Sequence, residues 1–128
     1  MKIKTLLAIF TFLFITSFQA NAADALSADA IKALIVGNTV NGEHLKKDFK
    51  FTAYFKADGT AIRNWKGEVQ NGTYFFKESD KQHCVNFGGG DKCATIVPNG
   101  DGSYKRLKNG NSDKHFINWL SISKGKNL

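Results

Sequence analysis

The chain has 128 residues and a formal net charge of +7, a length that fits one domain with a single modest core. Its basic character could attract an anionic partner such as lipid headgroups or an acidic protein, although scattered lysines also keep a small domain soluble. The export signal described next argues against nucleic acid as a partner.

The first 22 residues have the three parts of a secretory signal peptide. A basic start, Met1-Lys2-Ile3-Lys4, precedes an apolar run from Leu6 to Phe18, and Ala20-Asn21-Ala22 is a small-residue cleavage site. Cleavage would leave 23–128 as a single domain, and the loss of the two leader lysines would lower the net charge from +7 to +5. No second apolar run follows, so we expect no stable membrane insertion after cleavage and a periplasmic or secreted protein.

A short amphipathic helix is predicted over residues 28–36. Ser27 is a favourable N-cap, and Gly37 suits the left-handed position that ends a helix. Three apolar residues have the i, i+3, i+4 spacing of one helical face, namely Ile31, Leu34 and Ile35. Because so short a helix is unstable alone, we expect it to plug one end of the structure that follows or to lie along its side.

After this helix the pattern becomes that of short strands separated by tight turns. From Phe49 to Lys56, apolar and polar residues alternate with a period of two. Turn-forming pairs recur at Asn41-Gly42, Asp58-Gly59, Asn71-Gly72, Gly88-Gly89, Asn99-Gly100 and Asn109-Gly110. Further strands are predicted over 60–69, 73–78, 82–87, 92–97, 103–108 and 115–123.

Such strands in sequence order form a meander, whose two outer strands stay unpaired unless the sheet closes. The sequence therefore predicts a mainly β fold. We expect an up-and-down antiparallel meander that closes into a small calycin-like β-barrel, preceded by one short N-terminal α-helix. A small sandwich of two sheets is the alternative.

The two cysteines, Cys84 and Cys93, flank the glycine pair that is predicted to form a turn. A two-residue turn at Gly88-Gly89 places them directly opposite each other on adjacent strands, where a disulfide forms in an oxidising compartment. The alternative is that His83 joins both sulfurs in a metal site. Neighbouring strand residues point to opposite faces, which disfavours a shared ion, so we predict a disulfide, no metal and no cofactor.

Four aromatic residues are candidates for lining a ligand site inside the barrel, because aromatic walls are typical of such sites. They are Tyr54, Trp65, Tyr74 and Trp119. The alternative is that these side chains simply fill the core, since a barrel of this size can be packed solid. Adjacent Phe75 and Phe76 cannot both face inward, so at least one aromatic ring in this segment lies outside.

No catalytic residue is predicted. The three histidines, His44, His83 and His115, are isolated, and the few carboxylates lie mostly at predicted turns. With both cysteines paired there is no thiol nucleophile. We therefore expect a protein that is not an enzyme.

Several short motifs together resemble a family of small exported proteobacterial proteins of unassigned function. The motifs are Leu26-Ser27-x-x-x-Ile31-x-x-Leu34, Gly37-Asn38-Thr39-Val40-x-Gly42, Tyr54-Phe55-x-x-Asp58-Gly59-Thr60, Asn71-Gly72-Thr73-Tyr74 and the Cys84/Cys93 pair. They span most of the mature chain, and one departure is Tyr74 where the family usually has Trp. The resemblance implies the same fold and export but brings no catalytic residue, cofactor or substrate.

These observations favour an exported, non-catalytic small binding protein of the bacterial envelope that holds a small apolar or amphipathic ligand. The alternative is an inhibitor or partner protein of an envelope or secreted enzyme, to which the basic C-terminal strand could steer an acidic target.

Overall fold

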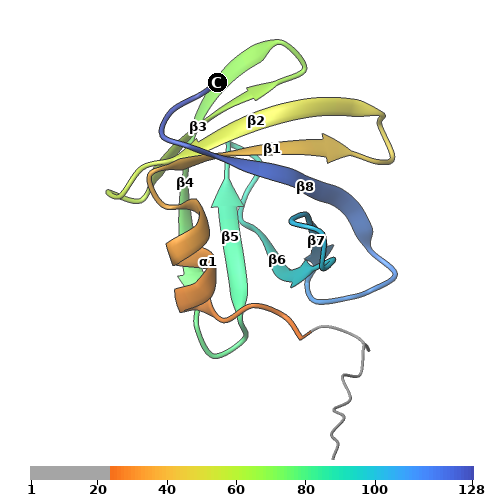
Figure 1. Cartoon of the computed structure of the whole chain (residues 1–128). Coiled ribbons are helices and arrows are strands. Elements are labelled where there is room, and N and C mark those ends of the chain that lie inside the picture. The colour runs from red at the N-terminus through yellow and green to blue at the C-terminus, as the bar shows by residue number, and fades with distance from the viewer. Residues whose placement is uncertain (1–23) are drawn as a thin grey trace, which may run out of the picture.

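A computed structural model describes residues 24–128, so the predicted signal peptide lies outside the described residues. The described chain starts with helix α1 (Ala28–Ile35) and continues in eight antiparallel strands (Figure 1). The strands are β1 (Asn38–His44), β2 (Phe49–Phe55), β3 (Thr60–Trp65), β4 (Glu68–Lys77), β5 (Gln82–Asn86), β6 (Lys92–Pro98), β7 (Tyr104–Lys108) and β8 (His115–Lys124). The predicted up-and-down barrel with one N-terminal helix is confirmed.

Closure of the sheet follows from the pairing of its first and last strands. β1 pairs with β2 along one side and with β8 along the other, both antiparallel. Each of the eight strands therefore has a hydrogen-bonded neighbour on both sides, which removes the exposed edges that an open meander would present.

The two ends of the barrel are built by different connections. Because strand direction alternates, the connections after β1, β3, β5 and β7 lie at one end, and those after β2, β4 and β6 lie at the other. We call the first the open end; it comprises residues 45–48, 66–67, 87–91 and 109–114. Helix α1 leads directly into the start of β1 and so lies at the second, which we call the plugged end.

Helix α1 closes the plugged end with its apolar face. Ile31 and Ile35 are fully buried and belong to one core cluster with side chains from inside the barrel. The barrel members of that cluster are Val40, Ala53, Phe55, Ala61, Tyr74, Ile96 and Trp119. Of the two expected positions for the helix, the structure therefore has the plug.

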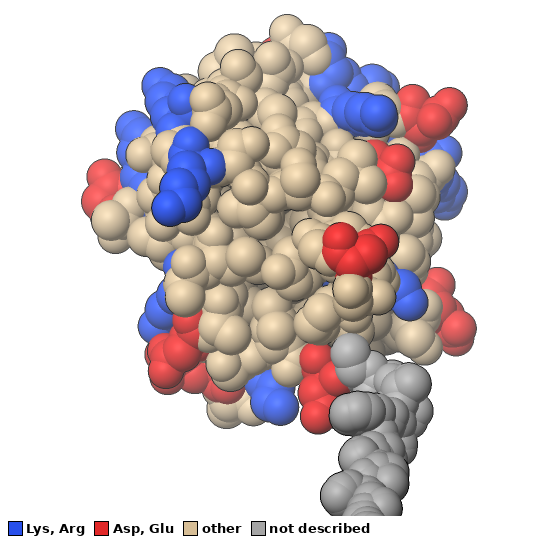
Figure 2. All heavy atoms as spheres, viewed as in Figure 1, with Lys and Arg blue, Asp and Glu red and all other residues tan. Residues whose placement is uncertain are grey.

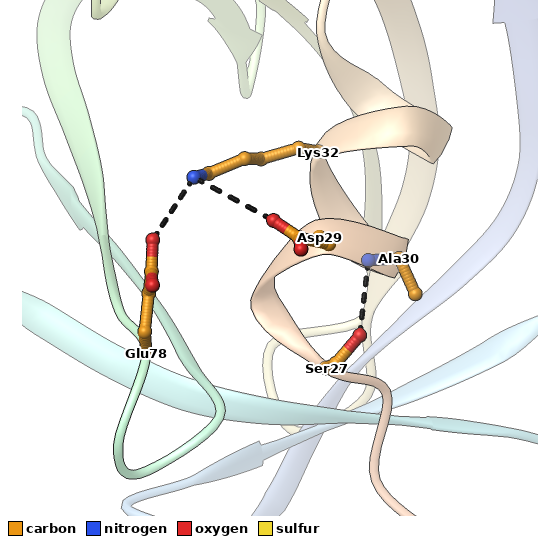
Figure 3. Close-up of polar contacts among 5 residues, drawn as sticks. All are labelled: Ser27, Asp29, Ala30, Lys32 and Glu78. Atoms are coloured by element: carbon orange, nitrogen blue, oxygen red, sulfur yellow. Dashed lines mark hydrogen bonds and ion pairs between the residues drawn. The ribbon is translucent and has the colours of Figure 1, made fainter.

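Polar contacts fix both ends of this plug. The Oγ of Ser27 accepts the backbone N–H of Ala30 at 3.1 Å, as predicted for an N-cap (Figure 3). The Lys32 ammonium lies 3.2 Å from a carboxylate oxygen of Glu78, on the β4–β5 connection (Figure 3). Both partners of that ion pair are well exposed, so it contributes little to stability compared with the buried isoleucines.

Two predicted turns lie inside strands instead. Asn71-Gly72 is in the middle of β4, paired with β3, and a Cβ atom on Gly72 would lie 2.3 Å from the carbonyl oxygen of Asn86. Asn41-Gly42 is in β1, where the pairing with β8 shifts register, and a Cβ on Gly42 would lie 2.3 Å from the Phe51 ring. These glycines allow close approach of a neighbour and do not reverse the chain.

The predicted strand 60–69 is also wrong, because it joins two strands. β3 ends at Trp65 and β4 begins at Glu68. Lys66 and Gly67, which separate them, both have positive φ, 55° and 82°. Two consecutive positive φ values are characteristic of a type I′ hairpin turn. The turn was missed because lysine rarely adopts this conformation.

The predicted disulfide is present. Cys84 on β5 faces Cys93 on β6 in the pairing register, as predicted, and the two sulfurs are bonded. The connection between the strands is the five-residue segment 87–91 and not a two-residue turn at Gly88-Gly89. The bond fits a protein of an oxidising, non-cytoplasmic compartment. It also occupies both thiol ligands that the alternative metal site with His83 would need. Among residues 24–128, no helix is long and apolar enough to cross a membrane.

Candidate ligand pocket at the open end of the barrel

A pocket of about 460 Å³ occupies the open end of the barrel. Its walls come from the last residues of odd-numbered strands, the first residues of even-numbered strands and the connections between them. Apolar and aromatic lining is supplied by Trp65, Val85, Phe87, Phe116 and Ile117. The volume falls in the range of small-molecule sites, and the mixture of apolar walls with a few polar groups is typical of them.

Trp65 is held in place by other aromatic rings. Its ring centroid lies 4.7 Å from that of Phe49 and 5.1 Å from that of Phe51, both on the adjacent β2. His44 stacks on Phe49 with a centroid distance of 5.4 Å. These contacts give the pocket a rigid aromatic wall, because each ring restricts its neighbours.

Arg63 extends between two aromatic rings of this wall. Its guanidinium carbon lies 3.9 Å from the centroid of Trp65 and 4.1 Å from that of Phe87. Its Nε donates a hydrogen bond of 2.7 Å to the side-chain oxygen of Gln70. Desolvation lowers the pKa of Arg63 to about 10, so the group remains a cation at neutral pH.

Arg106 lines the same pocket from β7. One terminal nitrogen, Nη2, donates to the backbone carbonyls of Lys92 at 3.0 Å and His83 at 3.3 Å. Burial lowers the pKa of Arg106 to about 10, and this group is likewise charged at neutral pH. Both arginines thus place a positive charge in a partly desolvated pocket.

The other charges around this pocket are also positive. Four lysines line it, namely Lys47, Lys92, Lys108 and Lys114, and no Asp or Glu of the described chain does. The pKa of His44 is lowered by burial first and then by nearby lysines. By contrast, Figure 2 shows a face on which basic and acidic side chains are interspersed around the periphery. Positive charge is therefore gathered at the pocket, where it raises the local concentration of anions.

A smaller space of about 40 Å³ lies deeper in the barrel and shares Arg63, Trp65 and Arg106 with the outer pocket. Its inner wall includes His83, which is fully buried and has no hydrogen-bond partner on either ring nitrogen. The side chain is enclosed by aromatic rings at centroid distances of 5.2–6.0 Å, from Phe55, Tyr74, Phe76 and Trp119. Desolvation lowers the pKa of His83 well below its usual value, with a further contribution from Arg106.

The four aromatic residues predicted to line a ligand site lie in different places. Trp65 lines the outer pocket and the deeper space. Trp119 is 2% exposed and reaches only the deeper space. Tyr74 is buried in the core at the plugged end, where its hydroxyl donates to the carbonyl oxygen of Lys56. Tyr54 alternates with buried Phe55 on β2 and lines neither space.

Adjacent Phe75 and Phe76 differ in environment, as their alternation on β4 requires. Phe75 is 40% exposed, whereas Phe76 packs against the core cluster.

Arg63 and Arg106 are not among the candidate site residues predicted from the sequence. For Arg63 a signal existed, because Ala61, Arg63 and Trp65 share one face of β3 and that face is inward. A cation on an otherwise apolar inward face is a reason to include that residue among the candidate site residues. For Arg106 the signal was absent, because Lys105 and Lys108 beside it made the whole segment look like a solvated strand.

Comparison of this chain with protein-family models, with curated proteins and with solved structures gives no significant match. The resemblance to small exported proteobacterial proteins therefore remains a prediction. Within residues 24–128, no group of three or more His, Cys, Asp or Glu side chains is arranged to hold a metal ion.

Proposed function

We propose that this chain is an exported, non-catalytic binding protein that holds a small apolar or amphipathic molecule in the open end of its barrel. The proposal places it in the bacterial periplasm or outside the cell, where the Cys84–Cys93 disulfide is stable. The observation that carries the proposal is the pocket of about 460 Å³ with aromatic walls around Trp65.

A pocket filled by the protein's own side chains would argue for a purely structural core, and that is the situation at the other end. There Ile31 and Ile35 are fully buried and belong to the core cluster. At the open end no helix or strand of residues 24–128 covers the space, and Trp65, Phe87 and Phe116 border it. A concave apolar surface with convergent polar groups is the usual form of a small-ligand site.

Titration with the neutral apolar dye N-phenyl-1-naphthylamine tests this function. The mature, disulfide-bonded protein is expected to raise the dye's fluorescence with one saturable site, and the Trp65→Leu variant is expected to weaken binding at least fivefold. Phe75→Leu is the matched control, because it removes an exposed aromatic ring from the outside of β4. Unsaturable binding, or equal loss in both variants, would overturn the proposed site.

A further inference from the structure

We infer that the ligand of this pocket is an amphipathic organic anion, whose acid group binds between Arg63 and Arg106 while its apolar part packs on the aromatic wall. This inference rests on the proposed function and specifies the ligand class of the same site. Four features of the described residues support it: the position of the two arginines, their unused donors, their missing counter-charges and the partnerless His83.

The two arginines project from opposite walls toward one space. Arg63 is on β3 and Arg106 is on β7, four strands apart in an eight-stranded cycle. Both nevertheless line the deeper space of about 40 Å³ as well as the outer pocket. Because one water molecule needs roughly 10–15 Å³, that space has room for a carboxylate-sized group beside both arginines that line it.

Each guanidinium has donors left for an acid group. Arg63 uses Nε on Gln70, which leaves both of its terminal nitrogens. Arg106 uses Nη2 on two backbone carbonyls, which occupies both N–H groups of that nitrogen and leaves Nε and Nη1. The two backbone carbonyls thus hold the guanidinium of Arg106 in place. The rings of Trp65 and Phe87 do the same for Arg63. Two oriented guanidinium groups are the preferred protein partners of carboxylates and related oxyanions.

Within residues 24–128, no carboxylate forms an ion pair with either arginine. Lys32 makes all the ion pairs found in the described part of the chain, with Asp29 and Glu78. A partly buried charge without a partner is costly, and four lysines around the pocket increase the positive potential. A bound anion would supply the missing counter-charge, which is the physical reason to expect an acid and not a neutral ligand.

His83 gives an independent indication. Its imidazole is fully buried, lines the deeper space and has no partner on either nitrogen. A buried polar group without a hydrogen-bond partner lowers stability, so such a residue is expected where a ligand completes its hydrogen bonding. A neutral imidazole N–H can donate to the acid group that the arginines bind once the surrounding rings shift to admit it, because both ring nitrogens are buried in the ligand-free protein.

The apolar walls require that the acid carry an apolar body. Trp65, Phe87 and Phe116 border the outer pocket, and its volume of about 460 Å³ far exceeds that of an inorganic ion. Stacking or hydrophobic contact on these rings would orient the molecule, with the acid group inside and the apolar part toward the opening.

A pair of probes with one aromatic body separates charge from hydrophobicity. N-phenyl-1-naphthylamine is neutral, and 1-anilinonaphthalene-8-sulfonate carries the same rings with one acid group. The mature protein is expected to bind the sulfonate at least about tenfold more tightly than the neutral dye. Arg63→Gln and Arg106→Gln are each expected to weaken sulfonate binding about tenfold and to weaken neutral-dye binding by a clearly smaller factor. Only the sulfonate loses a charge-assisted contact, which is worth roughly tenfold in affinity.

Lys105→Gln is the matched control, because it removes the same charge from the exposed residue next to Arg106 on β7. It is expected to change neither affinity by more than about twofold. Arg63→Lys and Arg106→Lys keep the charge without the fork and are expected to retain part of the sulfonate affinity. Displacement of the sulfonate by sodium decanoate, but not by inorganic phosphate at the same concentration, would identify an amphipathic acid as the ligand class.

The outcomes separate the two proposals. Absence of saturable binding of the neutral dye overturns the proposed function itself. Saturable neutral-dye binding with no preference for the sulfonate keeps the proposed function and overturns the anion site. An equal loss of sulfonate affinity in Lys105→Gln, or displacement by phosphate as effective as by decanoate, also overturns it, because the attraction would then belong to the surface or to any small ion.

Discussion

Core packing alone does not explain why a histidine occupies position 83. A fully buried imidazole with two unpartnered nitrogens lowers stability, yet an apolar side chain of similar volume would fit the same aromatic enclosure. The residue is therefore better explained by the ligand site than by the core. This explanation has consequences for the ligand-free protein that can be measured without knowing the ligand.

His83→Leu is expected to raise the free energy of unfolding at pH 7.5 by about 1–2 kcal/mol, because it removes the desolvation cost of the imidazole. The same substitution is expected to weaken binding of the sulfonate dye. Urea unfolding followed by tryptophan fluorescence measures the first effect and dye titration the second. A variant that loses stability would show that the imidazole contributes to the core after all.

The pKa of His83, lowered well below 6.5 by burial, predicts an acid-side loss of stability. In the unfolded chain this side chain takes up a proton near pH 6.5, whereas in the folded protein it stays neutral until a lower pH. The unfolded state therefore binds more protons, and the free energy of unfolding falls as pH drops below 6.5, by up to about 1.4 kcal/mol per pH unit.

Urea unfolding at pH 7.5, 6.5, 5.5 and 5.0 measures this slope, which is expected to be smaller in His83→Leu. His44→Gln is the comparison variant. The pKa of His44 is also lowered, but this side chain is more exposed, so its removal is expected to change the slope less than removal of His83. Asp58 and Asp101 have lowered pKa values, so their contributions are lost at more acidic pH. An unchanged slope in His83→Leu would contradict the assignment.

At the scale of elements, a glycine in β4 allows the neighbouring strand β5 to approach closely. Gly72 lies where a Cβ atom would meet the carbonyl oxygen of Asn86 at 2.3 Å and the Phe87 ring at 2.6 Å. The β4–β5 approach, and with it the position of Phe87 in the pocket wall, depends on the absence of a side chain there.

Gly72→Ala is accordingly expected to lower the free energy of unfolding by about 1–3 kcal/mol, the usual cost of forcing extra volume into a packed site. Gly89→Ala is the matched control, because its Cβ would meet only the flexible end of Lys92, at 3.3 Å. Urea denaturation of both variants decides the point. Equal stabilities would show that β4 and β5 can separate without cost.

The limits of sequence interpretation are visible in these same elements. Helix 28–36 was predicted within one residue of α1, because capping and periodicity are local properties of the chain. Barrel closure followed from counting strands and asking what covers their edges. Asn71-Gly72 was misread because the need for a glycine there comes from Asn86 and Phe87, which are distant in sequence. Arg63 and Arg106 likewise line the same space only because the sheet closes into a barrel, and no local pattern around either arginine indicates this.

Helix α1 is expected to contribute to stability mainly through its two buried isoleucines. Ile31→Ala is expected to lower the free energy of unfolding by about 2–5 kcal/mol, because the side chain is fully buried in the core cluster. Ala33→Ser, on the exposed face of the same helix, is expected to cost about 0.5 kcal/mol. Chemical denaturation compares them, and similar losses would mean that the helix lies on the barrel without plugging it.

At the scale of the whole molecule, the proposed function assigns stability to one end of the barrel and binding to the other. The plugged end carries α1, Tyr74 and the largest part of the core cluster. The open end carries the cationic pocket, and the Cys84–Cys93 disulfide joins two strands beside it. An up-and-down barrel allows this division, because alternate connections lie at opposite ends and can vary independently.

This division predicts opposite effects for two aromatic residues that the sequence placed in one site. Tyr74→Phe removes the hydroxyl that bonds the Lys56 carbonyl. It is expected to cost about 0.5–1.5 kcal/mol of unfolding free energy and to leave the affinity for the sulfonate dye within about twofold. Trp65→Leu is expected to weaken dye binding at least fivefold, because Trp65 lines the pocket and stacks on Arg63. Thermal or urea unfolding and dye titration on the same samples give both readouts. A loss of dye affinity in Tyr74→Phe as large as in Trp65→Leu would mean that the ligand extends through the barrel to α1, and that the two ends work as one site.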